Sequence, residues 1–126
     1  MKVIIAGGRD FRDRILMSKK LDTILSTVTD GIEVVSGGQV TTDFDTREKY
    51  GADYLGEQWA EFHGYVVTRF PADWKTHGKS AGPKRNKQMA EYADALIAFW
   101  DSKSRGTKNM IDLATEKGLK VRVVRY

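Results

Sequence analysis

The chain alternates between short apolar runs and longer stretches of helical character, and this alternation constrains the fold more than any other feature. Five apolar runs have the length and β-branched content of buried strands; they cover residues 2–6, 32–35, 65–70, 95–100 and 121–124. The stretches between them predict helices over residues 14–29, 51–63, 80–92 and 107–117. Strict alternation of this kind is typical of a parallel sheet with helices on both faces.

Few topologies are compatible with such a sheet. Connections between parallel strands are right-handed, and the simplest arrangement with a central switch point has the strand order 3-2-1-4-5, counted along the chain. We therefore expect an α/β fold, a three-layer sandwich around a central parallel sheet of about five strands. The 126 residues are 40% hydrophobic, which suffices for a single domain over residues 1–126 with its own core.

Two glycines are placed to end helices. Asp30-Gly31 follows the first predicted helix, and Gly118 follows the last one. Glycine is common just after a helix because it adopts a positive φ without strain. We expect the two helices to end at these positions.

Glycine pairs directly follow the first two strands. One strand leads into Gly7-Gly8-Arg9-Asp10 and the next into Ser36-Gly37-Gly38. Such turns leave backbone N–H groups free at the carboxyl edge of a parallel sheet, where phosphates and nucleotides bind. A lone pair of this kind is also explained by a tight turn that binds nothing. Two pairs at equivalent strand ends favour a ligand site, which the predicted strand order places at the ends of strands one and four.

Composition excludes several kinds of site. The chain has no cysteine, which excludes disulfides, thiolate nucleophiles and cysteine metal sites. Its two histidines, His63 and His77, offer no recognisable ligand spacing, so we expect no metal and no cofactor. No apolar stretch approaches the ~20 residues of a membrane span, and the first strand starts at Lys2, which leaves no room for a signal peptide. We expect a soluble cytoplasmic protein with no membrane partner.

The net charge of +4 is distributed unevenly. Six Lys or Arg residues lie between Arg69 and Lys87, with Asp73 as the single acid among them. A basic run near glycine turns suits a phosphate-bearing ligand, although such runs are also ordinary solvated faces.

Residues 39–50 form a polar, threonine-rich segment. It is longer than the usual strand-to-helix loop of about 2–6 residues. Three interpretations stay open: a mobile flap over the site, a pairing element in an oligomer, or a passive surface loop.

A set of motifs in the chain resembles a known family. The motifs are Ala6-Gly7-Gly8-Arg9-Asp10-Phe11, Val35-Ser36-Gly37-Gly38, Gly51-Ala52-Asp53, Phe70-Pro71-Ala72-Asp73-Trp74, His77-Gly78-Lys79-Ser80-Ala81-Gly82-Pro83, Arg85-Asn86, Met89, Ala93-Asp94-Ala95-Leu96-Ile97-Ala98-Phe99 and Arg105-Gly106-Thr107. Their order and spacing resemble the YspA-like branch of the SLOG superfamily, small Rossmann-like proteins of bacteria and many phages. The resemblance implies a Rossmann-like domain that binds a nucleotide or nucleotide-derived ligand, in the host cytoplasm if phage-encoded. In most relatives the second glycine turn runs almost directly into Gly-Ala-Asp, so residues 39–50 are an insertion.

The resemblance and the strand ends together nominate a set of ligand-binding residues. The set is Gly7, Gly8, Arg9, Asp10, Ser36, Gly37, Gly38, Asp53, Asp73, Trp74, Gly82, Arg85, Asn86, Gly106 and Thr107. The glycine pairs would cradle phosphate or ribose, and the planar guanidinium of Arg85 would bind an anion. Either Trp74 or Trp100 would stack on the base.

Several of these residues also have a purely structural explanation. Asp10, Ser36 and Thr107 are suited to cap helices, Arg9 to pair with Asp10, and Arg85 to lie on an exposed helix face. Trp59, at helical spacing from Leu55 and Phe62, is predicted to belong to the core.

Cousins of this family, the lysine-decarboxylase-like phosphoribohydrolases, cleave N-glycosidic bonds with a Gly-x-Gly-Thr-x-x-Glu motif. This chain has Met110 at the glutamate position, and methionine can neither activate water nor stabilise an oxocarbenium-like transition state. An enzyme of this kind would need a carboxylate from another strand end. The candidates are Asp10, Asp53, Asp73 and Asp101.

We therefore expect a binding protein for a nucleotide-derived small molecule. A nucleoside-phosphate hydrolase or transferase is the first alternative. Single-stranded nucleic-acid binding is the second, suggested by the net charge and by the distantly related DNA-processing protein DprA. A homo-oligomer is a further expectation, because the cousins are commonly dimers.

Overall fold

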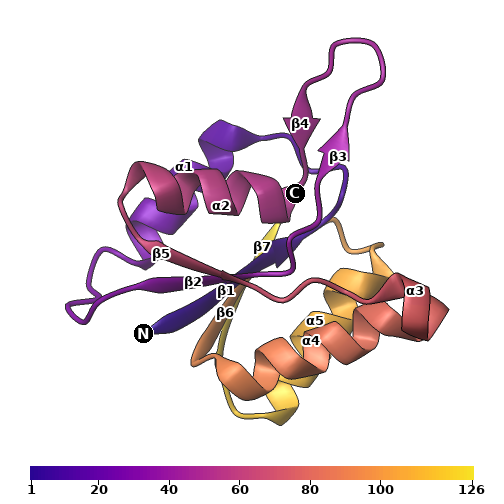
Figure 1. The fold of residues 1–126 in the computed structure, drawn as a ribbon. Coiled ribbons are helices and arrows are strands. Elements are labelled where there is room, and N and C mark those ends of the chain that lie inside the picture. The colour runs from indigo at the N-terminus through magenta and orange to yellow at the C-terminus, as the bar shows by residue number, and fades with distance from the viewer.

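The computed structural model describes residues 1–126 and has a five-stranded parallel sheet at its centre (Figure 1). The strands are β1 (Lys2–Gly7), β2 (Glu33–Ser36), β5 (Val66–Arg69), β6 (Ala95–Trp100) and β7 (Lys120–Arg125). They lie in the order β5-β2-β1-β6-β7, and every neighbouring pair is parallel. This arrangement confirms the predicted order 3-2-1-4-5.

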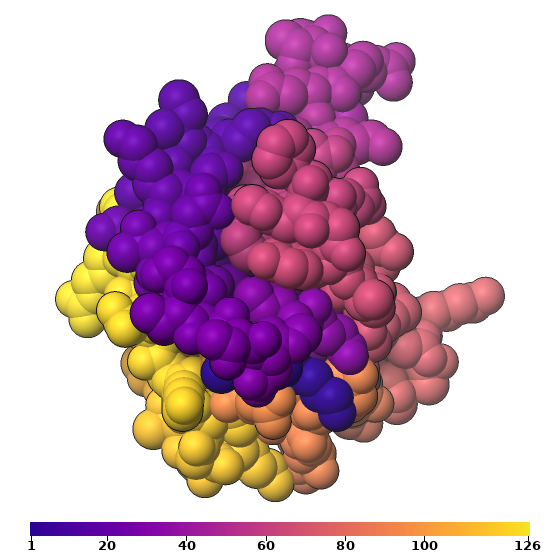
Figure 2. Space-filling model, turned by 90° about the vertical axis from the view of Figure 1, so that its left-hand side faces the viewer, coloured from indigo at the N-terminus to yellow at the C-terminus, as the bar shows by residue number.

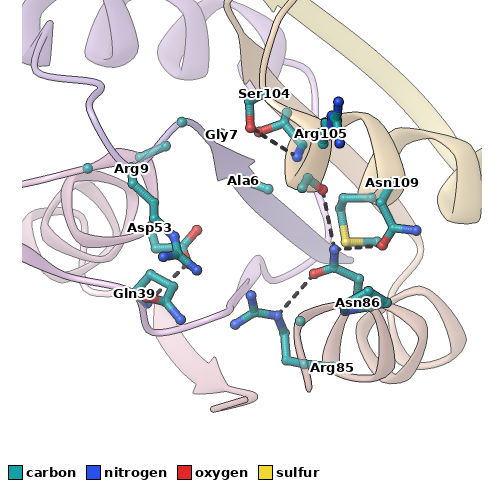
Figure 3. A pocket seen from close by; sticks show the side chains of 18 of the residues that line it. Ala6, Gly7, Arg9, Gln39, Asp53, Arg85, Asn86, Ser104, Arg105 and Asn109 are labelled. Atoms are coloured by element: carbon teal, nitrogen blue, oxygen red, sulfur yellow. Dashed lines mark hydrogen bonds between the residues drawn. The ribbon is translucent and has the colours of Figure 1, made fainter. Parts of the chain in front are cut away.

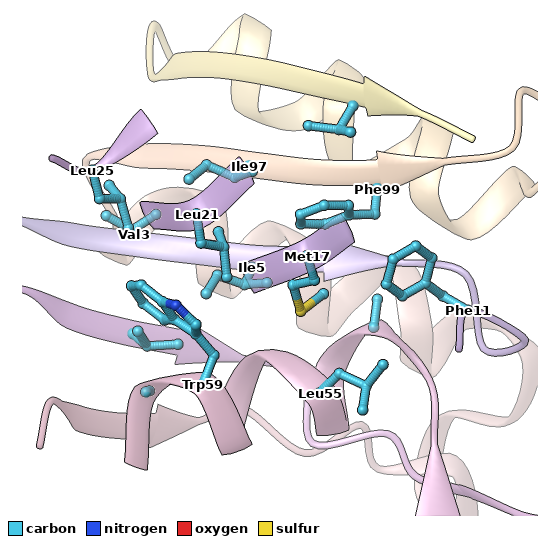
Figure 4. Close-up of a cluster of buried hydrophobic side chains, with 14 of the residues drawn as sticks. Val3, Ile5, Phe11, Met17, Leu21, Leu25, Leu55, Trp59, Ile97 and Phe99 are labelled. Atoms are coloured by element: carbon cyan, nitrogen blue, oxygen red, sulfur yellow. The ribbon is translucent and has the colours of Figure 1, made fainter. Parts of the chain in front are cut away.

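Helices cover both faces of the sheet, as the alternation predicts. They are α1 (Arg14–Ile24), α2 (Ala52–Phe62), α3 (Trp74–His77) with a 3-10 turn (Gly78–Ser80), α4 (Ala81–Tyr92) and α5 (Arg105–Glu116). Alternate residues of a strand point to opposite faces, so β1 sends Val3 and Ile5 into one core cluster and Ile4 and Ala6 into another. The first cluster lies under α1 and α2 (Figure 4) and the second under α4 and α5. No helix is both long and apolar enough to cross a membrane.

The predicted end of the first helix is wrong. α1 ends at Ile24 with Leu25 as its C-cap, well before residue 29, and Gly31 does not adopt a positive φ. The reason is the hydroxyl-rich sequence after Leu25, since serine and threonine side chains compete for backbone hydrogen bonds; the Ser26 hydroxyl donates to the Thr23 carbonyl at 2.8 Å. Gly118, by contrast, has φ of 76° just past the end of α5, as expected.

The inserted segment forms a short antiparallel hairpin of β3 (Thr41–Thr42) and β4 (Lys49–Tyr50). It projects away from the body of the molecule (Figures 1 and 2). Arg12 holds its base: the guanidinium lies 3.6 Å from the centre of the Tyr50 ring and bonds to the Asp43 carboxylate at 3.1 Å. At the tip, the Phe44 side chain is 93% exposed.

Candidate functional site

A cavity of about 590 Å³ opens at the carboxyl edge of the sheet (Figure 3). It is lined by the end of β1 and the turn after it, by the first turns of α2, α4 and α5, and by Trp74 at the start of α3. This is the location that the strand order predicts, beyond the ends of β1 and β6. In Figure 3, Arg9, Gln39 and Asp53 lie on one side of the cavity and Ser104, Arg105 and Asn109 on the other.

Three helices begin at the wall of this cavity. Their contributions are Gly51, Ala52 and Asp53 from α2, Gly82 and Pro83 from α4, and Ser104, Arg105, Gly106 and Thr107 from α5. The first N–H groups of a helix have no partner within it and carry partial positive charge, which favours anions. In α5 the Ser104 hydroxyl caps the Thr107 N–H at 3.3 Å, so the N–H groups of Arg105 and Gly106 are left for a ligand.

Gly7 and Gly8 both line the cavity. A Cβ on Gly7 would lie 2.5 Å from the Phe99 carbonyl oxygen and 2.7 Å from the Ala52 Cβ. Gly7 therefore allows β1, β6 and the start of α2 to approach one another closely behind the cavity. A Cβ on Gly8 would meet only the ends of side chains, with Asp10 Oδ1 at 2.6 Å.

The second glycine turn lies behind the cavity wall. Ser36, Gly37 and Gly38 do not line the cavity. The buried Ser36 hydroxyl donates to Glu57 Oε2 at 2.6 Å and accepts from the Gly38 N–H at 3.0 Å. The carbonyl of Gly37 accepts from Arg85 Nη1 at 2.7 Å, so the structure uses this turn to seat Arg85.

Arg85 is the most firmly held cation of the cavity. It is 8% exposed, and its Nε donates to Asn86 Oδ1 at 3.0 Å while Nη1 donates to Gly37. Its Nη2 makes no hydrogen bond within the chain. Asn86 is fixed in turn, because its amide donates to Asn109 Oδ1 at 3.0 Å and to the Gly106 carbonyl at 3.3 Å. Burial lowers the pKa of Arg85 and nearby Asp53 opposes this shift, but an arginine remains charged at neutral pH.

Asp53 is the carboxylate with the most unusual environment in the cavity. Its Oδ2 accepts from the Gln39 N–H at 3.1 Å. Burial raises the pKa of Asp53 to about 6, against the opposing effects of the Gln39 hydrogen bond and the charges of Arg85 and Arg9. Neither guanidinium forms an ion pair with it. Asp53 therefore titrates near neutrality, as general acids and bases in enzymes do.

The other candidate carboxylates have structural partners. Asp10 lines the cavity and accepts from the Tyr126 hydroxyl at 3.3 Å; α1 is capped by Asp13, so the capping explanation for Asp10 is wrong. Asp101 accepts from the N–H groups of Lys103 and Ser104, both at 2.8 Å, and the pKa of Asp101 is lowered by these bonds. Asp73 lies outside the cavity and caps α3.

Of the two tryptophans proposed to stack on a base, the structure brings only Trp74 to the cavity. Its ring packs on Gly82, its side chain is 43% exposed, and the Arg9 guanidinium lies 5.5 Å from the ring centre. Trp100 does not line the cavity and donates its indole N–H to the Ser104 carbonyl at 3.0 Å.

The predicted core position of Trp59 is confirmed, at 7% exposure. Leu55 is buried with it, but Phe62 is 87% exposed because α2 ends at that residue. Met110, at the position of the cousins' glutamate, is 1% exposed and packs in the core under the cavity. No three His, Asp or Glu side chains lie close enough together to hold a metal ion.

Sequence reasoning missed four polar residues of the cavity wall: Gln39, Ser104, Arg105 and Asn109. Ser104 could have been found, because a serine three residues before a threonine at a helix start is a capping signal. Gln39 and Asn109 could not have been found, because they reach the wall through contacts with residues distant in sequence and belong to no local sequence motif.

Comparisons with known proteins agree with the fold. A family model described as "YspA, cpYpsA-related SLOG family" matches residues 1–77. The "Gene 61 protein" of Mycobacterium phage D29 is 33% identical, over 95% of this chain and 93% of that protein. No solved structure matches the chain. The family model thus covers Gly7, Asp53 and Trp74, whereas Arg85 and the start of α5 lie beyond the residues that it matches.

Proposed function

Because the chain belongs to the YspA, cpYpsA-related SLOG family, we propose that its cavity binds a nucleotide or a nucleotide-derived ligand. The observation that carries this proposal is the hydrogen bonding of the Arg85 guanidinium. A buried guanidinium with two donors fixed and Nη2 free faces a cavity into which three helices begin. That arrangement is a preorganised anion site.

The ligand's phosphate belongs near Arg85 and the start of α5. The free Nη2 and the N–H groups of Arg105 and Gly106 supply directed donors there. Asn86, which bonds to both Arg85 and the Gly106 carbonyl, ties these two sides of the cavity together.

The rim of the cavity suits the base. Trp74 presents a half-exposed ring there, next to Arg9, for stacking on a base. Asp53 Oδ1 makes no hydrogen bond within the chain and is left to contact the ligand near Arg85. Together these groups match the phosphate and the base of a nucleoside monophosphate.

The test is calorimetric titration of the protein with AMP. We expect saturable binding to the wild type and at least tenfold weaker binding to Arg85→Ala, because a charge-assisted hydrogen bond contributes about 1.5–3 kcal/mol. The matched control is Arg122→Ala on β7, which removes an exposed cation remote from the cavity. Equal affinities of both variants would contradict the proposed site.

A second candidate function, cleavage of an N-glycosidic bond, is favoured by one observation. Asp53 is the cavity carboxylate whose pKa is raised, to about 6, which suits a general base at neutral pH. Chromatography of AMP incubated with the protein would reveal adenine and ribose 5-phosphate, and Asp53→Asn should slow their release by ~10²–10⁴-fold. Recovery of intact AMP from a protein that binds it would exclude this candidate.

A further inference from the structure

Asp53 and Arg85 are near neighbours in the cavity wall, although they form no ion pair. A Cβ built on Gly37 would lie 2.5 Å from Arg85 Nη1 and 2.9 Å from Asp53 Oδ2, so both atoms are within 3 Å of a single point. Both residues also line the same cavity, so an anion bound at Arg85 shares that cavity with the Asp53 carboxylate.

The charged groups that face Asp53 come from three elements. Arg85 on α4 and Arg9 in the turn after β1 favour its ionised form, whereas Glu57 on its own helix disfavours it. The Gln39 N–H, at the base of the hairpin, donates to Oδ2. Burial and Glu57 raise the pKa of Asp53 to about 6 against the effects of the Gln39 N–H, Arg85 and Arg9, so without a bound anion Asp53 is mostly ionised at neutral pH.

A bound phosphate upsets this balance. It engages the Arg85 guanidinium, which favours the ionised carboxylate, and its own charge repels Asp53 in a poorly solvated space. Two anions that share such a site cannot both remain ionised without cost, and one of them takes up a proton. The formal charges of the lining residues already cancel, with Arg9, Arg85 and Arg105 against Asp10, Asp53 and Asp101.

We propose that Asp53 binds one proton from solvent when a phosphate group occupies the cavity, so that the site exchanges its own negative charge for that of the ligand. This inference rests on the proposed function. The proton goes to Oδ1, which then donates to a phosphate oxygen, while Oδ2 continues to accept from Gln39. The O–H bond that forms on Asp53 replaces the bond to hydrogen that breaks in hydronium or in a buffer acid, and no other covalent bond changes. Asp53 thereby makes nucleotide affinity dependent on pH.

The experiment is titration of AMP into the wild type, Asp53→Asn and Asp30→Asn from pH 5.5 to 8, in buffers of different ionisation enthalpy. Asparagine mimics the protonated acid and keeps an acceptor for Gln39. Asp30→Asn is the matched control, because Asp30 is exposed and lies outside the cavity. The phosphate of free AMP also titrates near pH 6, but this titration is the same whichever protein is added and cancels in the affinity ratios.

We expect the wild type and Asp53→Asn to bind AMP equally at pH 5.5. By pH 8 the wild type should bind roughly tenfold or more weakly than Asp53→Asn, and near pH 7.5 it should take up close to one more proton per AMP. Asp30→Asn should follow the wild type at every pH.

Two results would overturn the inference, and they differ in what else they affect. Binding with the same pH profile and the same proton uptake in wild type and Asp53→Asn would overturn it and leave the proposed nucleotide site intact. A failure of all three proteins to bind either AMP or inorganic phosphate at any pH would overturn both.

Discussion

Asp53 is a residue whose ionised form lowers the stability of the folded protein. Its ordinary pKa is 3.8, and in the folded protein burial raises the pKa to about 6. Between these values the folded state binds more protons than the unfolded state, so stability falls as pH rises. Above pH 6 the full cost of the buried charge is present.

Replacing Asp53 by asparagine should therefore stabilise the protein in a pH-dependent way. We expect the free energy of unfolding of Asp53→Asn to exceed that of the wild type by about 1–3 kcal/mol at pH 7.5, and by little at pH 3.5. Urea denaturation at the two pH values measures this difference. An increment that is the same at both pH values, or one that Asp30→Asn reproduces, would contradict the assignment.

Gly7 is a second residue whose role can be isolated. A Cβ there meets a backbone oxygen, that of Phe99, at 2.5 Å, and a backbone atom cannot swing away as a flexible side chain can. Gly7→Ala should lower the free energy of unfolding by about 1–3 kcal/mol. Gly31→Ala is the control, because no atom lies within 4 Å of its Cβ and its φ is not positive; its effect should stay within about 0.5 kcal/mol. Equal effects of the two substitutions on denaturation curves would show that Gly7 is not packed as described.

The residues of the site were predictable from sequence to different degrees. Gly7, Asp53 and Arg85 belong to local motifs. Gly7 reaches the cavity because β1 ends there, and Asp53 and Arg85 reach it because α2 and α4 begin there. The seat of Arg85 on Gly37 joins positions far apart in the chain. No local pattern contains that contact, so Gly37 was predicted to touch the ligand and instead supports the residue that lines the cavity.

Among the elements, the β3–β4 hairpin depends least on the rest of the fold. It forms its own two-stranded sheet, and only the residues that flank it, Gln39 and Gly51, line the cavity. In this structure it therefore does not cover the site. Arg12 contacts Tyr50, Asp43 and Glu48. The Thr46 N–H, together with Arg12 and the Asp45 N–H, lowers the pKa of Asp43 to about 2.

Arg12→Ala should loosen the hairpin without unfolding the domain. Exposed ion pairs contribute up to about 1 kcal/mol each, so we expect a small change in global stability but faster tryptic cleavage after Arg47 and Lys49. Mass spectrometry of the fragments over time measures this, with Arg122→Ala as the control. Unchanged cleavage of Arg12→Ala would mean that the hairpin is held by its backbone alone.

Helix starts and helix ends differed in how well the sequence predicted them. α2 begins one residue after Gly51, whose φ of 107° only glycine adopts readily, and α4 begins within a residue of its predicted start. The end of α1 was misplaced because Asp30-Gly31 is an equally good turn signal in a loop. A turn signal of this type indicates that the helix has ended before it, but not at which residue the helix ends.

At the scale of the whole molecule, the site exists because the sheet has a switch point. From β1 the chain adds β2 and β5 along one flank of the sheet, and it then crosses back to add β6 and β7 along the other flank. The starts of α2, α4 and α5 thereby meet at one cavity. Strand alternation and right-handed crossovers leave few topologies, and this arrangement is the simplest of them with a central switch point. The polar network among Arg85, Asn86 and Asn109 then fixes the donors that we propose bind the anion.

The most direct test of this account is mass spectrometry of the small molecules released when purified wild-type protein is denatured, compared with Arg85→Ala and Arg122→Ala prepared in the same way. We predict a phosphate-bearing, nucleotide-derived compound from the wild type and from Arg122→Ala, and its depletion from Arg85→Ala. Release of the same compound in the same amount from all three proteins would contradict the central claim that the cavity at Arg85 is the nucleotide site.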